Sequence, residues 1–263
     1  MTITVQPLPA FTDNYIWALD RAGEAIVVDP GDGAVVQRWL DAGSLRLAAI
    51  VITHHHPDHT GGIALLRKAW DVPVYGPRAE HAKIAGLTTL LDDGDEIELF
   101  GERYTVIAVP GHTLGHIAYH GAGRLFCGDT LFSAGCGRLF EGTPAQMQAS
   151  LSRLAALPGD TRVYCTHEYT TSNLAFANAV EPGNAALQAR IAEVRELRAH
   201  ERPSLPSTIA LERAHNPFLR GDMPAVRAAA EAHAGHPLGD DTAVFATLRQ
   251  WKDGFRGQGL PST

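Results

Sequence analysis

Residues 53–62, THHHPDHTGG, hold the densest set of side chains that could do chemistry. Between His54 and His59 the chain carries four imidazoles and one carboxylate, which would repel and desolvate one another in an ordinary apolar core. A divalent metal ion makes such a cluster favourable, because neutral imidazole nitrogens and carboxylate oxygens are its ligands. We therefore interpret this segment as a metal-binding loop, with a solvent-exposed polyhistidine loop as the simpler alternative.

The spacing of these side chains indicates more than one metal ion. His54 and His56 are two residues apart, so on an extended backbone both point the same way and can bind one ion. Asp58 and His59 are adjacent and diverge, which suits a second ion. His55 lies between the first two ligands and is expected to face away as a non-ligand.

Three further candidates, His112, Asp129 and His167, each follow a run that is predicted to be a strand. The metal-binding loop also follows such a run, at residues 47–52, so all of these side chains are expected at strand ends. Asp129 could instead be a plain turn residue of a Gly-Asp-Thr turn. The prediction is one ion bound by His54, His56 and His112, a second bound by Asp58, His59 and His167, and Asp129 as the bridge between them.

The other acidic and imidazole groups have weaker claims. Asp29, at the end of a predicted strand, either supports the site from behind or caps the following segment. His116 and the remaining histidines are expected to be ordinary polar residues.

The bulk composition is ordinary for a soluble globular protein of 263 residues, with 45% hydrophobic and 19% charged residues. The formal charge of -7 argues against a nucleic-acid binder. The cysteines, at 127, 136 and 165, form no paired framework, as expected in a reducing cytosol. No apolar run approaches the roughly 20 residues of a membrane span, and the first residues do not form a signal peptide. We expect a cytoplasmic protein with no nucleic-acid or membrane partner.

The hydrophobic patterns divide the chain in two. Short strands alternate with helices up to residue 170, whereas alanine-rich helical periodicity dominates afterwards and no further strand is convincing. We predict a mixed α/β catalytic domain over residues 1–170 and a helical, substrate-binding domain over residues 171–263. Strands are predicted at 3–8, 14–19, 25–29, 47–52, 72–75, 89–91, 96–100, 104–109, 116–120, 124–127 and 161–165, and helices at 35–42, 62–70, 144–157, 173–180, 185–200, 224–234 and 241–252.

The ligand motifs together resemble the metallo-β-lactamase superfamily. Their order is THHHPDH at 53–59, GHT at 111–113, GDT at 128–130 and TH at 166–167. The resemblance implies an α/β fold of the αββα type, in which two mixed β-sheets form a sandwich flanked by helices. Members of this superfamily include thioesterases, lactonases, β-lactamases, nucleases and flavodiiron oxidoreductases, so these motifs do not name a substrate.

Longer stretches resemble one family within it, glyoxalase II or hydroxyacylglutathione hydrolase. These stretches are PGHTLGH at 110–116, FCGDTLF at 126–132, AGCGR at 134–138, THEYT at 166–170, NPFLR at 216–220 and RQWKDGF at 249–255. They span nearly the whole chain. The resemblance implies glutathione contacts from Arg138, Phe140, Tyr169, Arg249 and Lys252. Relatives often carry lysine and tyrosine at the first two of these positions.

The implied reaction is hydrolysis of S-D-lactoylglutathione, or a related S-(2-hydroxyacyl)glutathione, to glutathione and the hydroxy acid. Two divalent ions, zinc with iron and manganese as alternatives, would lower the pKa of a shared water towards about 7. Asp58 is expected to orient the resulting hydroxide as well as to bind metal. A thiolate leaves without an added proton donor, which agrees with a thioester substrate. We expect a monomer that binds this small molecule.

Other readings stay open at this point. A persulfide dioxygenase with a single iron, or a lactonase, would share the fold. A flavodiiron oxidoreductase usually carries a glutamate where His56 stands. A nuclease would need a basic surface, and a non-enzymatic metal-binding protein would not need the basic residues implied to bind glutathione.

Overall fold

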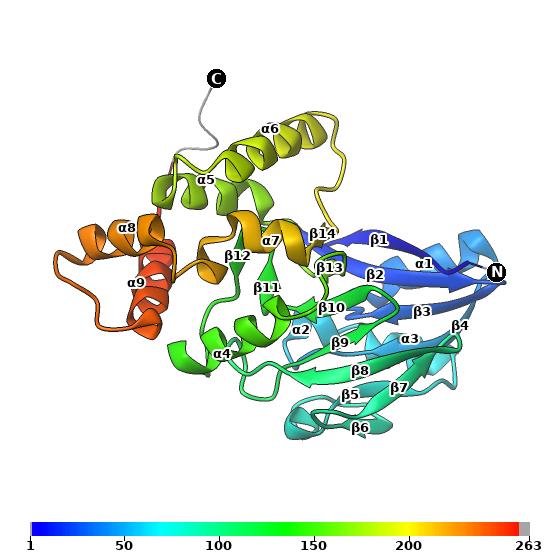
Figure 1. Cartoon of the computed structure of the whole chain (residues 1–263). Coiled ribbons are helices and arrows are strands. Elements are labelled where there is room, and N and C mark those ends of the chain that lie inside the picture. Colours follow the sequence, from blue (N-terminus) through cyan, green and yellow to red (C-terminus); the bar gives the residue numbers. More distant parts are fainter. Residues whose placement is uncertain (1, 258–263) are drawn as a thin grey trace.

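The computed structural model describes residues 2–257, whose strands form two six-stranded sheets that pack face to face (Figure 1). In the first sheet the strands follow chain order, and β3, β4, β5 and β6 run parallel. Its strands are β1 (Thr4–Ala10), β2 (Asn14–Arg21), β3 (Glu24–Val28), β4 (Arg46–Val51), β5 (Val74–Pro77) and β6 (Thr89–Leu91).

The second sheet has the order β14-β13-β10-β9-β8-β7, with one parallel pair, β10 and β13. Its strands are β7 (Glu96–Leu99), β8 (Glu102–Ala108), β9 (Ile117–Gly121), β10 (Arg124–Gly128), β13 (Arg162–Cys165) and β14 (Ser207–Thr208). A separate two-stranded hairpin joins β11 (Leu131–Phe132) to β12 (Gly135–Cys136).

Strand β2 shows why the sheets pack as they do. Alternate side chains point to opposite faces, and both faces of this strand are buried. Trp17 belongs to the core between the sheets, where its ring meets Tyr164 of the second sheet edge-on at 4.8 Å. Ile16 and Ala18 belong to a second core on the outer face, beneath α1 and α3. A buried strand of this kind therefore has no polar face.

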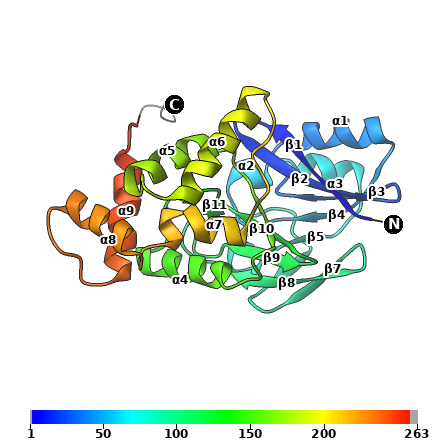
Figure 2. The same cartoon turned by 45° about the horizontal axis from the view of Figure 1, so that its top comes forward.

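Helices cover the sandwich on its outer faces. Asp32 caps the first helix, and Thr143 forms a capping box with Gln146 at the start of α4. Figure 2 places α4 (Pro144–Ala155) beside the ends of β8 and β9, on the opposite side of the sandwich from α1 and α3. The helical segments up to residue 165 are α1 (Gly33–Gly43), α2 (Pro57–Thr60), α3 (Ile63–Ala69), the 3-10 turn η1 (Arg78–Glu80) and α4 (Pro144–Ala155).

The C-terminal part is mostly helical and gathers at one end of the sandwich (Figure 2). Phe176 and Phe245 join the core between the sheets, so the helices extend that core, whereas Leu174 and Leu187 belong to a separate cluster shared by the fifth and sixth helices. The helical segments are α5 (Thr170–Val180), α6 (Ala185–Ala199), α7 (Ile209–His215), the 3-10 turn η2 (Pro217–Leu219), α8 (Pro224–Ala234) and α9 (Asp241–Gly254).

The predicted fold class, a two-sheet αββα sandwich with a C-terminal helical region, is confirmed. The expectation of no strand after residue 170 is wrong, because β14 pairs with β13 at the edge of the second sheet. The helices α2 and α7 were also not predicted, since both are short and carry little apolar periodicity. No helix within residues 2–257 combines the length and the apolar character needed to cross a membrane.

Candidate metal centre and substrate cavity

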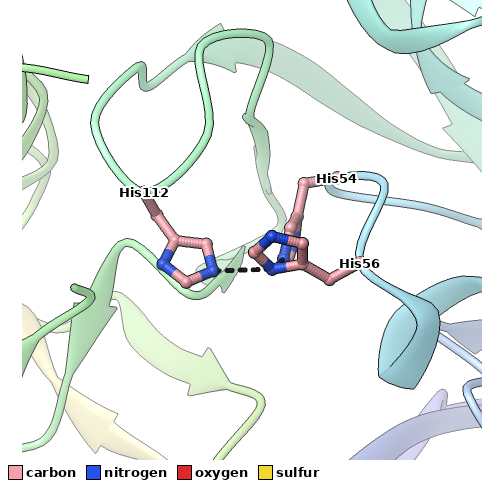
Figure 3. A group of neighbouring side chains, drawn as sticks. All are labelled: His54, His56 and His112. Atoms are coloured by element: carbon pink, nitrogen blue, oxygen red, sulfur yellow. Dashed lines mark hydrogen bonds between the residues drawn. The ribbon is translucent and has the colours of Figure 1, made fainter. Parts of the chain in front are cut away.

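The predicted ligands converge at one edge of the sandwich, although they come from four separate segments. His54 and His56 follow β4, and Asp58 and His59 lie on the one-turn helix α2. The other three follow β8, β10 and β13, and they are His112, Asp129 and His167. Figure 3 shows the rings of His54, His56 and His112 turned towards one another.

The first group consists of His54, His56 and His112, which were predicted to bind one ion. His56 Nδ1 lies 3.0 Å from His54 Nε2 and 3.0 Å from His112 Nε2. His54 and His112 are buried, whereas His56 is partly open to the cavity. Three imidazole nitrogens therefore point at one small volume.

The second group consists of Asp58, His59 and His167. Asp58 Oδ2 lies 3.5 Å from His59 Nε2 and 3.5 Å from His167 Nε2. The two histidines are buried, and the Asp58 side chain is partly exposed. This group thus combines two imidazoles with a carboxylate that reaches the cavity.

Asp129 lies between the two groups. Its Oδ2 is 3.4 Å from His112 Nε2 and 3.3 Å from His167 Nε2, and its Oδ1 is 3.5 Å from His59 Nε2. One carboxylate therefore faces histidines of both groups, which is the arrangement a bridging ligand needs.

Hydrogen bonds behind the rings fix which nitrogen is free. Asp29 Oδ2 accepts from Thr53 Oγ1 at 2.7 Å and lies 3.0 Å from His59 Nδ1. Because a carboxylate accepts only, His59 carries its proton on Nδ1, and Nε2 is free to bind. The Thr53 hydroxyl, having donated to Asp29, can accept from His54 Nδ1 at 3.1 Å. Asp29 therefore supports the site from behind and does not cap a helix.

The same logic holds on the other side of the cluster. Asp13 Oδ1 lies 2.7 Å from His167 Nδ1, and the backbone carbonyl of Arg138 lies 2.9 Å from His112 Nδ1. Both partners are acceptors, so each ring carries a proton on Nδ1 and turns Nε2, the nitrogen left for a metal ion, to the centre.

The electrostatics of the cluster suit a cation. Burial lowers the pKa of His54 well below its usual value. Burial also disfavours the charged form of His59, but the carboxylates of Asp129 and Asp29 outweigh it and raise that pKa well above normal. Burial opposes ionisation of Asp129 too, yet His167 and His59 hold its pKa well below normal. The carboxylates thus attract positive charge to the middle of the site.

Two buried atoms of the cluster lack hydrogen-bond partners, His59 Nε2 and Asp129 Oδ1. An unpaired buried polar atom is costly unless something binds it. The donor set of imidazole nitrogens and carboxylate oxygens fits divalent cations. The residues present therefore fit the divalent metal ions that the sequence implies.

Two neighbouring histidines lie outside these groups. His55 turns away, with its Nδ1 2.9 Å from Glu80 Oε2. His116 stacks on His54 at 4.5 Å, and its Nε2 accepts from the Asp129 backbone N–H at 3.1 Å. His116 thus helps to position Asp129 without facing the centre.

A cavity of about 630 Å³ opens directly onto the cluster. The five predicted glutathione contacts, which are far apart in sequence, all line this cavity together with residues of the metal cluster. Its lining includes His56, Asp58, His112, Asp129, Phe132, Cys136, Arg138, Phe140, His167, Tyr169, Ser172, Asn173, Arg249, Lys252, Asp253 and Phe255.

The two arginines of the cavity differ in their exposure and in the contacts that hold them. Arg138 is exposed, with Nε 3.6 Å from Asp253 Oδ1. Arg249 is 5% exposed, donating from Nη1 to the Cys136 carbonyl at 2.8 Å and from Nη2 to Asp253 Oδ1 at 3.0 Å. Arg249 Nε is buried without a partner. Arg138 can therefore move to meet a ligand, while Arg249 also supports the cavity wall.

Lys252 is held between aromatic rings. Its Nζ donates to the Ser172 carbonyl at 3.0 Å and lies 5.6 Å from the ring centre of Phe176. Burial lowers its pKa to about 8, and the nearby Arg249 charge adds to this effect. An anionic ligand beside Lys252 would favour the charged amine again.

Aromatic side chains line the side of the cavity nearest the metal cluster. The Tyr169 ring stacks on His167 at 4.7 Å, and burial raises the pKa of its hydroxyl. The Phe140 ring meets His56 edge-on at 5.6 Å and His112 at 5.2 Å. Phe140 therefore offers this part of the cavity an apolar surface.

Comparisons with known proteins identify the family. The model of the metallo-beta-lactamase superfamily matches residues 11–167, and that of the hydroxyacylglutathione hydrolase C-terminus matches residues 168–255. A hydroxyacylglutathione hydrolase of Cupriavidus taiwanensis is 57% identical over 97% of this chain and 100% of its own length. One of Dechloromonas aromatica is 55% identical over 94% of this chain and 98% of its own length. The chain belongs to the hydroxyacylglutathione hydrolase family.

Solved structures share the fold at lower identity. ETHE1 from Myxococcus xanthus superposes with a TM-score of 0.65 at 24% identity, covering 99% of this chain and 92% of that one. TTHA1623, solved in a di-iron-bound form, gives a TM-score of 0.60 at 27% identity, covering 82% of this chain and 100% of that one. These structures show the shared fold, and the family models and the relatives of more than 50% identity confirm the resemblance to the glyoxalase II family that the motifs predicted.

Several residues around the metal centre and the cavity were not predicted from the sequence. Asp13 and Asn14 lie at the start of β2, where nothing in the local pattern indicates a partner 44 or more positions away. Ser172 and Asn173 of α5 line the cavity but look like ordinary helix residues in the sequence. Such contacts exist only after distant segments pack together, so no short motif could have shown them.

The hairpin β11–β12, also missed, forms part of the cavity wall and is held by side chains of the helical part. Asn173 Nδ2 donates to the Ser133 carbonyl at 3.1 Å, and Asn216 Nδ2 donates to the Gly135 carbonyl at 2.9 Å. The buried carboxylate of Glu212 accepts from the Ala134 N–H at 2.8 Å. The helical part therefore shapes the cavity wall as well as lining it.

Proposed function

We propose that this chain is a thioesterase that hydrolyses S-(2-hydroxyacyl)glutathione, and S-D-lactoylglutathione in particular, to glutathione and the 2-hydroxy acid. The observation that carries the proposal is a single cavity with a His/Asp cluster on one side and cationic side chains on the other. Its relatives over nearly the full length are hydroxyacylglutathione hydrolases. A persulfide dioxygenase or a lactonase is not favoured by these relatives.

Two divalent ions are proposed as cofactors, with Asp129 as the shared ligand. The first would be held by His54, His56 and His112, and the second by Asp58, His59 and His167. When bound, such ions supply a water of lowered pKa and polarise the carbonyl under attack. Zinc is the proposed metal; iron and manganese accept the same ligands, and TTHA1623 carries two irons.

The carboxylate of Asp58 would orient the attacking water by accepting a hydrogen bond from it. Asp58 is partly exposed to the cavity, and one of its oxygens faces His59 and His167. Its second oxygen remains available to accept a hydrogen bond and so to orient the attacking water. The thiolate of glutathione leaves without a proton donor, because its parent thiol has a pKa of about 8.5.

The opposite side of the cavity would bind the glutathione portion. Arg138 and Lys252 present cationic groups, and Arg249 contributes a buried Nε without a partner. These groups complement the carboxylates of the tripeptide in a protein whose formal charge is -7. Tyr169 packs against His167, Phe140 packs against His56 and His112, and both would cover the thioester with aromatic surface.

We also propose a cellular location, an oligomeric state and a division into domains. The three cysteines, at 127, 136 and 165, are buried and unpaired, which supports a cytoplasmic location. We also propose a monomer without nucleic-acid or membrane partners, in which residues 1–170 form the catalytic domain and residues 171–263 the glutathione-binding domain. Residues 258–263 lie outside the described chain.

The test compares two thioesters of the same hydroxy acid. S-D-lactoylglutathione should be hydrolysed at least about 100-fold more efficiently, in kcat/KM, than S-lactoyl-N-acetylcysteamine, which lacks both carboxylates of glutathione. Loss of thioester absorbance measures both reactions. Equal efficiency on the two would remove glutathione recognition from the proposal, and no hydrolysis of either would remove the thioesterase.

A further inference from the structure

One buried side chain contacts a proposed ligand without belonging to the ligand set. Asn14 is 5% exposed, and its Nδ2 donates to Asp58 Oδ2 at 3.0 Å. A carboxylate oxygen only accepts hydrogen bonds, so the amide nitrogen of Asn14 must face it. The same oxygen lies 3.5 Å from His59 Nε2 and from His167 Nε2. Asn14 thus holds the oxygen that faces both imidazoles of this group.

Asp58 needs such a contact more than the other ligands do. Its side chain is 38% exposed, and it sits on a helix of four residues, α2. Apart from the imidazoles of the centre, Asn14 is its side-chain hydrogen-bond partner within residues 2–257. An exposed aspartate otherwise moves freely between rotamers. The hydrogen bond from Asn14 selects the rotamer that points into the centre.

Asn14 is itself fixed to the strand end that carries His167. The Tyr15 N–H donates to the Thr166 carbonyl at 2.6 Å, and the Glu168 N–H donates to the Asp13 carbonyl at 2.8 Å. The backbone of Asn14 and His167 forms an isolated β-bridge between these bonds. The donor to Asp58 and the imidazole of His167 are therefore parts of one rigid unit.

The contact is confined to one half of the centre. In the half made by His54, His56 and His112, the groups behind the rings are the Thr53 hydroxyl and the Arg138 carbonyl. Within residues 2–257 the Asn14 side chain makes no hydrogen bond to those three histidines, and its partner among the proposed ligands is Asp58. Loss of the amide should therefore weaken one half selectively.

We propose that Asn14 is a positioning residue that sets cation binding in the half formed by Asp58, His59 and His167. This inference rests on the ligand assignment of the proposed function. It goes beyond that function because it assigns a role to a residue outside the ligand set. Asn14 would raise the metal affinity of one half of the centre and not of the other.

The test titrates metal-free protein with Zn²⁺ by calorimetry in two matched backgrounds. In His56→Ala, which breaks the other half, adding Asn14→Ala should weaken Zn²⁺ binding by about 10–100-fold. In Asp58→Ala, which removes the partner of Asn14, adding Asn14→Ala should change the remaining affinity less than about twofold. Asn14→Ser, which keeps a donor of shorter reach, should recover part of the loss.

Equal weakening in both backgrounds, or no weakening in either, would overturn the inference. Asn216→Ala provides the control, because Asn216 is a buried asparagine that donates to the hairpin and not to the metal cluster. Circular dichroism establishes that each variant is folded, and Asn14→Leu, which keeps the side-chain volume without a donor, replaces Asn14→Ala if the latter does not fold. Wild-type protein that binds Zn²⁺ but hydrolyses no thioester would reject the proposed function and leave this inference standing.

Discussion

The two sides of the cavity are built in different ways. On the metal side, the ligands follow the ends of β4, β8, β10 and β13, and most are buried and held by hydrogen bonds from behind. On the proposed glutathione side, Arg138 and Phe140 come from the loop before α4, Tyr169 precedes α5, and Arg249 and Lys252 lie on α9. Their exposure varies from the open Arg138 to the buried Arg249. Most side chains of the first side are fixed by hydrogen bonds, whereas the exposed Arg138 of the second side can adjust to a ligand.

This difference predicts how substitutions divide between catalysis and binding. A change on the metal side should lower kcat, because it disturbs groups that act on the reacting carbonyl. A change on the glutathione side should raise KM, because those groups bind a portion of the substrate that does not react.

The largest effect is expected for Asp129→Ala. Asp129 faces His112, His167 and His59, so its loss affects both halves of the centre. Losing a group behind a ligand already costs about 10–100-fold, so kcat should fall by more than about 100-fold. Steady-state kinetics with metal analysis of the same sample measures this. A variant that keeps both its metal and its kcat would show that Asp129 is a turn residue only.

A smaller effect is expected on the opposite side for Lys252→Ala. A hydrogen bond to a charged group contributes about 1.5–3 kcal/mol, so KM should rise by about 10-fold or more while kcat stays within about twofold. The double variant with Arg249→Ala should raise KM further. Unchanged KM in the double variant would exclude both residues from the glutathione site.

Arg249→Ala alone should lower the thermal stability of the protein more than Lys252→Ala does. Arg249 ties the hairpin through the Cys136 carbonyl, and it is buried. Its loss leaves that carbonyl without this donor, at a cost of about 1–3 kcal/mol, so Tm should fall by several degrees. Thermal unfolding of both single variants measures the difference. Equal Tm values would mean that Arg249 does not support the wall.

The pH dependence of KM provides a finer test. Because the pKa of Lys252 is lowered to about 8, the free protein loses this charge as pH rises through about 8. A bound anion favours the charged form, so KM should increase above pH 8 towards the value of Lys252→Ala. Lys252→Arg keeps its charge, and its KM should stay flat to pH 9. The same rise in Lys252→Arg would assign the titration to another group.

The smallest effect is expected for Phe140→Tyr. The ring of Phe140 already lies against His56 and His112, so the substitution adds only a hydroxyl. One neutral hydrogen bond contributes about 0.5–1.5 kcal/mol, so KM should fall by about 2–10-fold with kcat unchanged. An increase in KM would indicate that this position binds an apolar part of the substrate.

The same contrast explains what could be predicted from the sequence. The side chains at 54, 56, 58 and 59 lie within one short motif, and the other three ligands follow apolar runs whose strand character is readable. Those runs indicated a mixed α/β domain, whereas the two-sheet sandwich was implied by the resemblance to the metallo-β-lactamase superfamily. Asn14, Asp13 and the hairpin contacts could not be predicted, because Asn14 meets Asp58 only once β2 and β4 lie in one folded sheet. The strand β14 is two residues long and carries no pattern of its own.

The most direct test measures hydrolysis of S-D-lactoylglutathione and metal content on one purified sample. We expect rapid hydrolysis with two metal ions per chain, a loss of at least about 100-fold in rate after a chelator removes the metal, and recovery when Zn²⁺ is returned. Full activity in the metal-free protein would contradict the role of the His/Asp cluster. Absence of hydrolysis with both metal ions bound would contradict the thioesterase.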